Sequence, residues 1–138
     1  LAEPYVAIGS DASLRRLPAE GDGGGNGLAH PRAYGTPARF LGTFVRDLGL
    51  VDWKEGIRRL TSLPADIVGL ADRGRLREGA AADLVLFDPN AIADRATYEQ
   101  PARPPDGIRH VFGGGERVVA DGRHTGATPG KLLRRGDL

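Results

Sequence analysis

A carboxylate directly after a short apolar run is the first feature of this chain that could do chemistry. Residues 5–8 are apolar, and Gly9, Ser10 and Asp11 follow them. An apolar run of this length is typical of a buried strand, and Gly-Ser-Asp marks where such a strand reaches the surface. In a parallel α/β barrel, residues just beyond the strands' carboxyl ends form the active site. An Asp there can ligate a metal or move a proton, although Asp is also a common turn former or helix N-cap.

Composition limits the classes of partner that the chain could bind. The 138 residues carry 19 basic and 18 acidic side chains, so the net charge of +1 creates no bulk field for nucleic acid or an anionic membrane. No apolar run approaches the roughly 20 residues of a membrane span, and no signal-peptide pattern opens the chain. The absence of Cys excludes disulfides and thiolate metal sites within this segment and fits a cytoplasmic protein.

The elements that must position these groups fall into two halves. After the apolar run, the spacing predicts a helix from Thr36 to Leu48 with Pro37 in its first turn and Gly49 as its stop. Asp52, with a Glu three residues later, predicts the start of a second helix, and residues 62–68 a short third one. The apolar residues of these helices recur at helical spacing, which indicates faces that pack into a core.

From residue 73 onward the pattern becomes that of short strands. We expect strands over 82–87, 108–112 and 116–120, the last two joined by a glycine turn. Asp121-Gly122 predicts a second tight turn, before a short strand around Arg123. We therefore divide the chain into residues 1–72 and residues 73–138.

The glycine-rich stretch over residues 18–27 predicts a flexible loop. Such runs sometimes cradle phosphate, but no Lys-Ser/Thr pair and no helix start follow the last glycine of this one, so a phosphate-binding role is disfavoured.

Three sequence blocks are distinctive: His-Pro-Arg-Ala-Tyr-Gly-Thr at 30–36, Asp-Arg-Ala-Thr-Tyr at 94–98 and His-Thr-Gly-Ala-Thr-Pro-Gly at 124–130. In their order and spacing the chain resembles the C-terminal part of an N-acyl-D-amino-acid deacylase (D-aminoacylase) of the amidohydrolase superfamily, and these blocks are the narrower marks of that resemblance. The Ala-Asp-Leu-Val block at 82–85 occurs in many amidohydrolases and supports only the superfamily. The resemblance covers residues 5–135, nearly the whole chain.

The resemblance implies the fold class and the cofactor. The class is α/β: a fragment of a metal-dependent (β/α)8 barrel in residues 1–72, with its last strand over residues 5–9 and its closing helices after that, followed by the C-terminal strands of a small β-sandwich in residues 73–138. Zinc is the expected cofactor of the full-length enzyme. The three histidines, at 30, 110 and 124, have none of the spacings of the family's metal ligands, so we expect the main ligands to lie outside this chain.

For Asp11 the resemblance implies the proton-transferring carboxylate. It would accept a proton from zinc-bound water as that water attacks the amide, and then deliver the proton to the departing amine. As an acidic side chain at the barrel mouth, Asp11 could also act as a weak metal ligand.

Four further residues are candidates for substrate binding: Ser10, His30, Arg32 and Tyr34. Arg32 could pair bidentately with a substrate carboxylate, and His30 could hydrogen-bond Asp11 or the substrate. An equally weighted alternative is that this loop is structural, with Arg32 satisfying carbonyl groups and His30 packed. Ser10 fits a supporting hydrogen-bond donor better than a nucleophile, because no Ser-His-Asp arrangement follows it. We expect the two later histidines, in the predicted strands, to be structural.

The favoured function is hydrolysis of the amide of an N-acyl-D-amino acid to a carboxylate and a D-amino acid, by a hydrolase of carbon–nitrogen bonds other than peptide bonds. The partner would then be a small molecule, not nucleic acid or a membrane. Two alternatives stay open: an amidohydrolase acting on a cyclic amide, as hydantoinases do, and a stand-alone, non-catalytic binding module.

The chain begins at Leu1 and contains no Met, which indicates the downstream piece of a longer polypeptide. We expect catalysis to need the missing N-terminal part of the barrel, so that residues 1–138 alone are inactive and fold poorly. The acyl group, the preferred D-residue, the number of metal ions and the oligomeric state are not encoded in these motifs.

Overall fold

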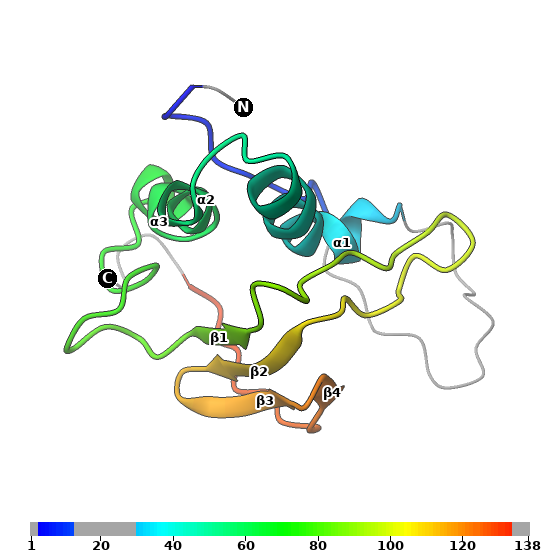
Figure 1. Ribbon diagram of the computed structural model, residues 1–138. Coiled ribbons are helices and arrows are strands. Elements are labelled where there is room, and N and C mark those ends of the chain that lie inside the picture. Colours follow the sequence, from blue (N-terminus) through cyan, green and yellow to red (C-terminus); the bar gives the residue numbers. More distant parts are fainter. Residues whose placement is uncertain (1–2, 13–29, 134–138) are drawn as a thin grey trace.

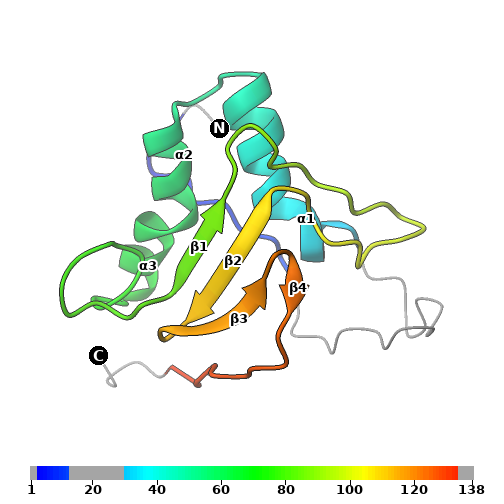
Figure 2. The ribbon, with the colours of Figure 1, turned by 60° about the horizontal axis from the view of Figure 1, so that its bottom comes forward.

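Helices form one side of the structure and a single β-sheet forms the other (Figures 1 and 2). The computed structural model describes residues 3–12 and 30–133. In chain order the elements are α1 (Arg32–Arg39), the π-helix η1 (Phe40–Asp47), α2 (Trp53–Leu60), α3 (Ser62–Val68), β1 (Leu84–Phe87), β2 (Ile108–Gly113), β3 (Glu116–Ala120) and β4 (Arg123–His124). No helix in the described ranges is long and apolar enough to cross a membrane. The glycine-rich stretch over 18–27 lies outside the described residues.

The first helix begins earlier than the sequence predicts. Thr36 and Pro37 lie inside α1 and do not start it, since the helix begins at Arg32. The prediction was wrong because the turn before Thr36 is already closed by the backbone carbonyl of His30, which accepts from the Ala33 N–H at 2.9 Å. Pro37 has no N–H to donate to the preceding turn, and three residues later the helix widens into η1.

The next two helices form where the local signals predict them. The Asp52 carboxylate accepts from the Glu55 backbone N–H at 2.7 Å and so caps α2. α3 ends at Gly69, which adopts the left-handed conformation at φ +81°.

The sheet is an antiparallel meander in the order β1-β2-β3-β4 (Figure 2). Asp121 and Gly122 both have positive φ, at +49° and +75°, and form the two-residue turn between β3 and β4 that their sequence predicts. The carboxylate of Asp83 accepts from the Gly114 N–H at 2.8 Å and pairs with Arg73. This Asp of the Ala-Asp-Leu-Val block therefore joins the turn between β2 and β3 to the segment that follows α3.

The strand predicted over residues 5–9 is not formed in the described structure. Residues 6–12 have no regular secondary structure, and the Ile8 N–H donates to the carbonyl of Arg59 in α2 at 3.1 Å. A parallel barrel strand is held by hydrogen bonds to neighbouring strands, and none of the described strands pairs with this segment. The apolar character of the run is still used, since Ile8 packs against the core.

The core is formed where the first helices meet the segment after β1. Its buried members are Ala38, Phe40, Leu41, Val45 and Ile92. Partly buried side chains from α2 and from the sheet pack against them. Side chains from both predicted halves of the chain thus share one core.

Gly42 allows η1 to lie directly against the backbone of the segment after β1. A Cβ at Gly42 would lie 2.5 Å from the carbonyl oxygen of Ile92, the most deeply buried member of the core at 1% exposure. Because this neighbour is backbone, it cannot rotate away as a side chain could.

We predict that Gly42→Ala destabilises the protein by about 1–3 kcal/mol, the usual cost of overpacking a core. The measurement is urea unfolding of the full-length, metal-free protein. Gly130→Ala is the matched control, since a Cβ at Gly130 meets no atom within 4 Å. Equal midpoints for the two variants would show that the close approach at Gly42 does not constrain the fold.

Candidate active site

Asp11 and Arg32 form an exposed ion pair at the start of α1. The Arg32 Nη2 atom donates to Asp11 Oδ2 at 2.7 Å, and the Asp11 side chain is 85% exposed. Asp11 has a φ of +52°, a conformation that most residues with a Cβ avoid but that Asp tolerates. The carboxylate is therefore accessible and is held by one charged hydrogen bond.

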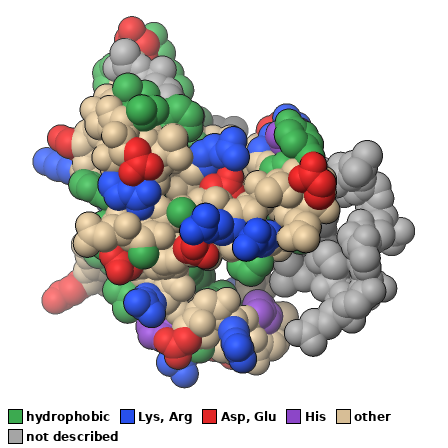
Figure 3. All heavy atoms as spheres, turned by 45° about the vertical axis from the view of Figure 1, so that its right-hand side comes forward, with side chains coloured by type: hydrophobic (Ala, Val, Ile, Leu, Met, Phe, Trp, Pro, Cys, Tyr) green, Lys and Arg blue, Asp and Glu red, His purple; other side chains and the backbone are tan. Residues whose placement is uncertain are grey.

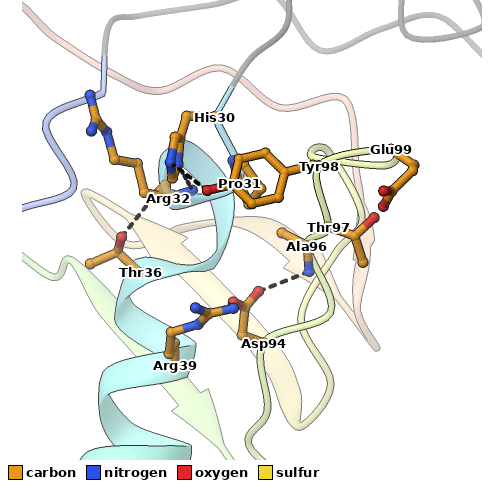
Figure 4. Close-up of a pocket in the computed structure, with 10 residues that line it drawn as sticks. All are labelled: His30, Pro31, Arg32, Thr36, Arg39, Asp94, Ala96, Thr97, Tyr98 and Glu99. Atoms are coloured by element: carbon orange, nitrogen blue, oxygen red, sulfur yellow. Dashed lines mark hydrogen bonds and ion pairs between the residues drawn. The ribbon is translucent and has the colours of Figure 1, made fainter.

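His30 joins Arg32 to a distant segment of the chain. Its Nδ1 atom accepts from the backbone N–H of Arg32 at 3.1 Å, and its Nε2 atom lies 3.2 Å from the hydroxyl of Tyr98. The two rings meet edge to face, with centroids 5.2 Å apart and planes at 74°. Figure 4 shows the hydroxyl of Tyr98 directed at the His30 ring.

These side chains line a pocket of about 320 Å³ between the first turns of α1 and the segment over residues 94–99. The Asp94 carboxylate fixes that segment, because Oδ2 accepts from Arg39 Nε at 2.9 Å and Oδ1 from the Ala96 N–H at 2.8 Å (Figure 4). Gly35 makes the approach possible, since a Cβ there would overlap the Asp94 carboxylate. The pocket is lined by His30, Pro31, Arg32, Thr36, Arg39, Asp94, Ala96, Thr97, Tyr98 and Glu99.

The acceptors in this pocket are more fully used than its donors. Both oxygens of the Asp94 carboxylate accept hydrogen bonds, as described above. The Glu99 carboxylate accepts hydrogen bonds from the Glu99 backbone and from the Thr97 side chain, and these lower the pKa of Glu99. Of the Arg39 guanidinium, only Nε is engaged by another described side chain. The arrangement leaves N–H groups of arginine available to an oxygen-rich ligand.

The structure brings together three of the five predicted site residues: Asp11, His30 and Arg32. Of these three, His30 and Arg32 line the pocket, and Asp11 reaches it through its ion pair with Arg32. Ser10 and Tyr34 are half-buried and also lie outside the pocket lining, and within the described ranges their side chains make no hydrogen bond. Tyr98 has no assigned role in the sequence analysis, although it ends the Asp-Arg-Ala-Thr-Tyr block that carries the resemblance. That block was the available signal.

The two later histidines belong to the sheet, as the sequence predicts. His110 lies on β2, edge to face with Phe112, with centroids 6.4 Å apart. His124 lies on β4, and its Nδ1 atom accepts from the Gly126 N–H at 3.0 Å.

The segment that leads to Asp11 is anchored on α2 by a cluster of charges. Arg59 is 2% exposed, and its Nε donates to Glu55 Oε1 at 2.7 Å. Arg58 donates from Nε to Glu55 Oε2 at 2.7 Å and from Nη2 to the carbonyl of Pro4. The hydrogen bonds from Arg58 and Arg59 lower the pKa of Glu55 to about 2. Arg59 also offers its backbone carbonyl to Ile8, so α2 holds the segment at two points.

The described residues do not by themselves form a metal site. Within residues 3–12 and 30–133, no three His, Cys, Asp or Glu side chains are grouped as ligands. Asp11 could contribute one carboxylate, and that carboxylate is paired with Arg32. A zinc ion at this site would need ligands from outside the described residues.

Comparison with known proteins places the chain in a family. A model described as "Amidohydrolase family" matches residues 18–119. The chain belongs to the amidohydrolase family.

Its relatives within this amidohydrolase family are deacylases of D-amino acids. The chain is 43% identical over 106 residues to a D-aminoacylase of Alcaligenes xylosoxydans xylosoxydans, covering 77% of this chain and 22% of that protein. It is 40% identical over 137 residues to an N-acyl-D-aspartate deacylase of the same organism, covering 99% of this chain and 25% of that protein. The resemblance predicted from the sequence blocks is confirmed.

The solved structures agree. An N-acyl-D-glutamate deacylase of Bordetella bronchiseptica, in complex with zinc and a phosphonate inhibitor that mimics the reaction's tetrahedral intermediate, matches with a TM-score of 0.72 and 38% identity. The match covers 89% of this chain and 25% of that one. This amidohydrolase chain spans about a quarter of the length of the relatives that it matches.

We predict that the anchor on Glu55 gives the fold an acid-sensitive contribution. The folded pKa, about 2, lies below the ordinary value of 4.5. The contribution is therefore complete above pH 4.5 and is lost as the pH falls from 4.5 through about 2. Urea midpoints of the full-length, metal-free protein between pH 2 and 6 measure it.

Glu55→Gln should flatten this pH dependence, whereas the control Glu116→Gln, at an exposed strand residue, should not. Some dependence will remain in both variants, because arginine partners also lower the pKa of Asp47 and Asp66. A Glu55→Gln curve parallel to that of the parent would contradict the anchor.

Proposed function

We propose that this chain is the C-terminal part of a zinc-dependent N-acyl-D-amino-acid deacylase, which hydrolyses the amide to a carboxylate and a D-amino acid. The observation that carries the proposal is the accessible Asp11 carboxylate, ion-paired to Arg32 at 2.7 Å, in an amidohydrolase chain with D-amino-acid deacylases as its relatives. These relatives favour a linear N-acyl substrate over a cyclic amide. A cytoplasmic location, expected from the lack of cysteine, is part of the same proposal.

Asp11 is assigned the proton transfer. Hydrolysis of an amide needs a base that takes a proton from the attacking water and an acid that gives a proton to the amine, which is otherwise a poor leaving group. A single carboxylate can do both in turn, and the Asp11 carboxylate is exposed and held by Arg32. Asp11 is the only carboxylate within residues 6–12, the part of the described segment that leads toward the predicted barrel mouth.

Arg32 is assigned the substrate carboxylate. One of its terminal nitrogens, Nη2, is used by Asp11, so other N–H groups of the guanidinium are available to a second anion. His30 supports this arginine through its backbone N–H. Ser10 and Tyr34 complete the proposed substrate-binding set as half-buried residues beside Asp11 and Arg32 in sequence.

The proposed architecture rests on the resemblance to deacylases of which this chain covers about a quarter. We place residues 1–72 in a (β/α)8 barrel and residues 73–138 in a small β-sandwich. Residues 5–9 would form the last barrel strand only beside neighbouring strands from the rest of the protein, since none of the described strands pairs with them. Strand β1 supports the sandwich, because its apolar side chains Leu84, Val85 and Leu86 are exposed here. Further strands from the rest of the protein would cover them in a complete sandwich. Zinc would be held by ligands outside this chain. It would polarise the amide carbonyl and lower the pKa of the attacking water.

Asp11→Asn tests the proton transfer, since it keeps the shape of the side chain and removes the base. In the full-length enzyme with zinc, we expect hydrolysis of N-acetyl-D-amino acids and about a 10²- to 10⁴-fold lower kcat in the variant. Asp121→Asn is the matched control, because Asp121 is also an exposed Asp with positive φ, in the turn between β3 and β4.

An undiminished rate in Asp11→Asn would remove Asp11 from the mechanism. If the full-length protein without substitutions releases no amine from any N-acetyl-D-amino acid, either with or without added zinc, the proposed function is wrong.

Residues 1–138 alone should bind no stoichiometric zinc, turn over no amide and unfold without a sharp transition. The reasons are the absence of a ligand group in the described residues and the exposed apolar strand β1. Zinc analysis, an amidase assay and thermal unfolding of the isolated polypeptide measure the three properties. Turnover with bound zinc would refute the need for further barrel residues, and one cooperative transition would refute the folding expectation.

A further inference from the structure

We propose that Tyr98 is a positioning residue of this site: its hydroxyl holds the ring of His30 in one orientation, and His30 in turn holds the backbone of Arg32. The inference rests on the proposed function, because Arg32 is the residue assigned to the substrate carboxylate. Tyr98 and His30 are separated by 68 residues in sequence but lie 3.2 Å apart between the Tyr98 hydroxyl and Nε2 (Figure 4).

The tautomer follows from the partner of Nδ1. The backbone N–H of Arg32 can only donate, so His30 Nδ1, at 3.1 Å from that nitrogen, must carry a lone pair. A neutral imidazole then has its proton on Nε2, where it faces the Tyr98 oxygen. The hydroxyl thus accepts from His30, and its own proton is free to be donated elsewhere.

The contact matters because the first turn of α1 has no side-chain cap on its N-cap residue. Pro31 occupies that position and forms no capping hydrogen bond. His30 takes over the role, since its ring accepts from the N–H of Arg32 and its carbonyl from the N–H of Ala33 at 2.9 Å. The orientation of His30 therefore fixes the turn from which the Arg32 side chain extends.

The segment that carries Tyr98 is itself rigidly tied to α1. Its other end is held by the ion pair between Asp94 and Arg39, and the Asp94 carboxylate lies against Gly35. The segment over 94–99 therefore contacts α1 near both ends of the helix. Tyr98 acts from a fixed frame even though its ring is largely exposed.

The charged surface beside this frame is mixed. In Figure 3 basic and acidic side chains alternate on the face drawn, in keeping with the near-zero net charge. The guanidinium groups of Arg32 and Arg39 line the pocket together with the carboxylates of Asp94 and Glu99. An anionic substrate would then be selected by the placement of the arginine N–H groups and not by bulk charge. A residue that positions Arg32 would therefore affect substrate binding.

Tyr98→Phe in the full-length zinc enzyme is the first test, because it keeps the ring contact and removes only the oxygen. Arg32 is proposed to bind a part of the substrate that does not react, so the loss should appear as uniform binding. We expect KM to rise about fivefold, equivalent to one net hydrogen bond, with kcat nearly unchanged. Tyr5→Phe is the matched control, since Tyr5 is exposed and its hydroxyl has no hydrogen bond in the described part of the chain.

His30→Asn gives the decisive comparison. The Asn amide oxygen can replace Nδ1 as the acceptor for Arg32, but the side chain cannot reach Tyr98. Once Nε2 is absent, adding Tyr98→Phe should change KM no further. If the two substitutions instead multiply, Tyr98 does not act through His30 and the proposal is overturned.

A measurement without turnover separates this proposal from the proposed function. With ¹⁵N-labelled histidine rings, the full-length protein should show the Nε2–H tautomer of His30, which the Arg32 N–H sets and which Tyr98→Phe should therefore keep. Tyr98→Phe should instead speed hydrogen exchange at the Arg32 amide, because the His30 ring is no longer held at Nε2. An Nδ1–H tautomer in the parent, or unchanged exchange in Tyr98→Phe, overturns the proposal. If the parent hydrolyses no D-substrate, the proposed function fails, and these two signals still decide whether Tyr98 positions Arg32.

Discussion

The pairing of the buried Arg59 guanidinium with Glu55 is the interaction on which the arrangement of the site depends. A charge at 2% exposure is costly unless it is paired and hydrogen-bonded, and Glu55 supplies that partner from within the same helix. With Arg59 fixed, its backbone carbonyl is in place to accept from Ile8, three residues before Asp11. Within the described residues, the position of the segment carrying the candidate base is thus set by a helix.

The elements encoded by local signals are the ones that the sequence predicts well. The Asp52 cap, the Gly69 stop and the Asp121-Gly122 turn each depend on residues within one turn of chain, and each forms where it is expected. The start of α1 was missed because His30 closes the earlier turn with both its backbone carbonyl and its ring, and His is not among the usual N-terminal capping residues. The apolar pattern of residues 5–9 could not show whether a strand forms there, because a strand needs neighbouring strands to pair with as well as apolar residues.

The site divides in the same way. Asp11 follows an apolar run and could be found as a candidate from its neighbours, whereas its pairing with Arg32 spans 21 residues and required the structure. Tyr98 is further still from His30 in sequence, and its place at the end of the Asp-Arg-Ala-Thr-Tyr block was the one signal that could have marked it. In the opposite sense, Asp83 stands in a block shared by many amidohydrolases and yet holds a turn, through Gly114, instead of taking part in chemistry.

The contact between His30 and Tyr98 also has a consequence for the order of folding. The meander β1 to β4 is built from antiparallel neighbours, and its last two turns are tight ones that close short loops. Closing the loop between residues 30 and 98 costs more chain entropy and gains little until α1 and the 94–99 segment are each in place. We therefore expect the sheet and helices to form as a scaffold first, and the pocket between α1 and the 94–99 segment to be the last part of this region to become ordered and the first to open.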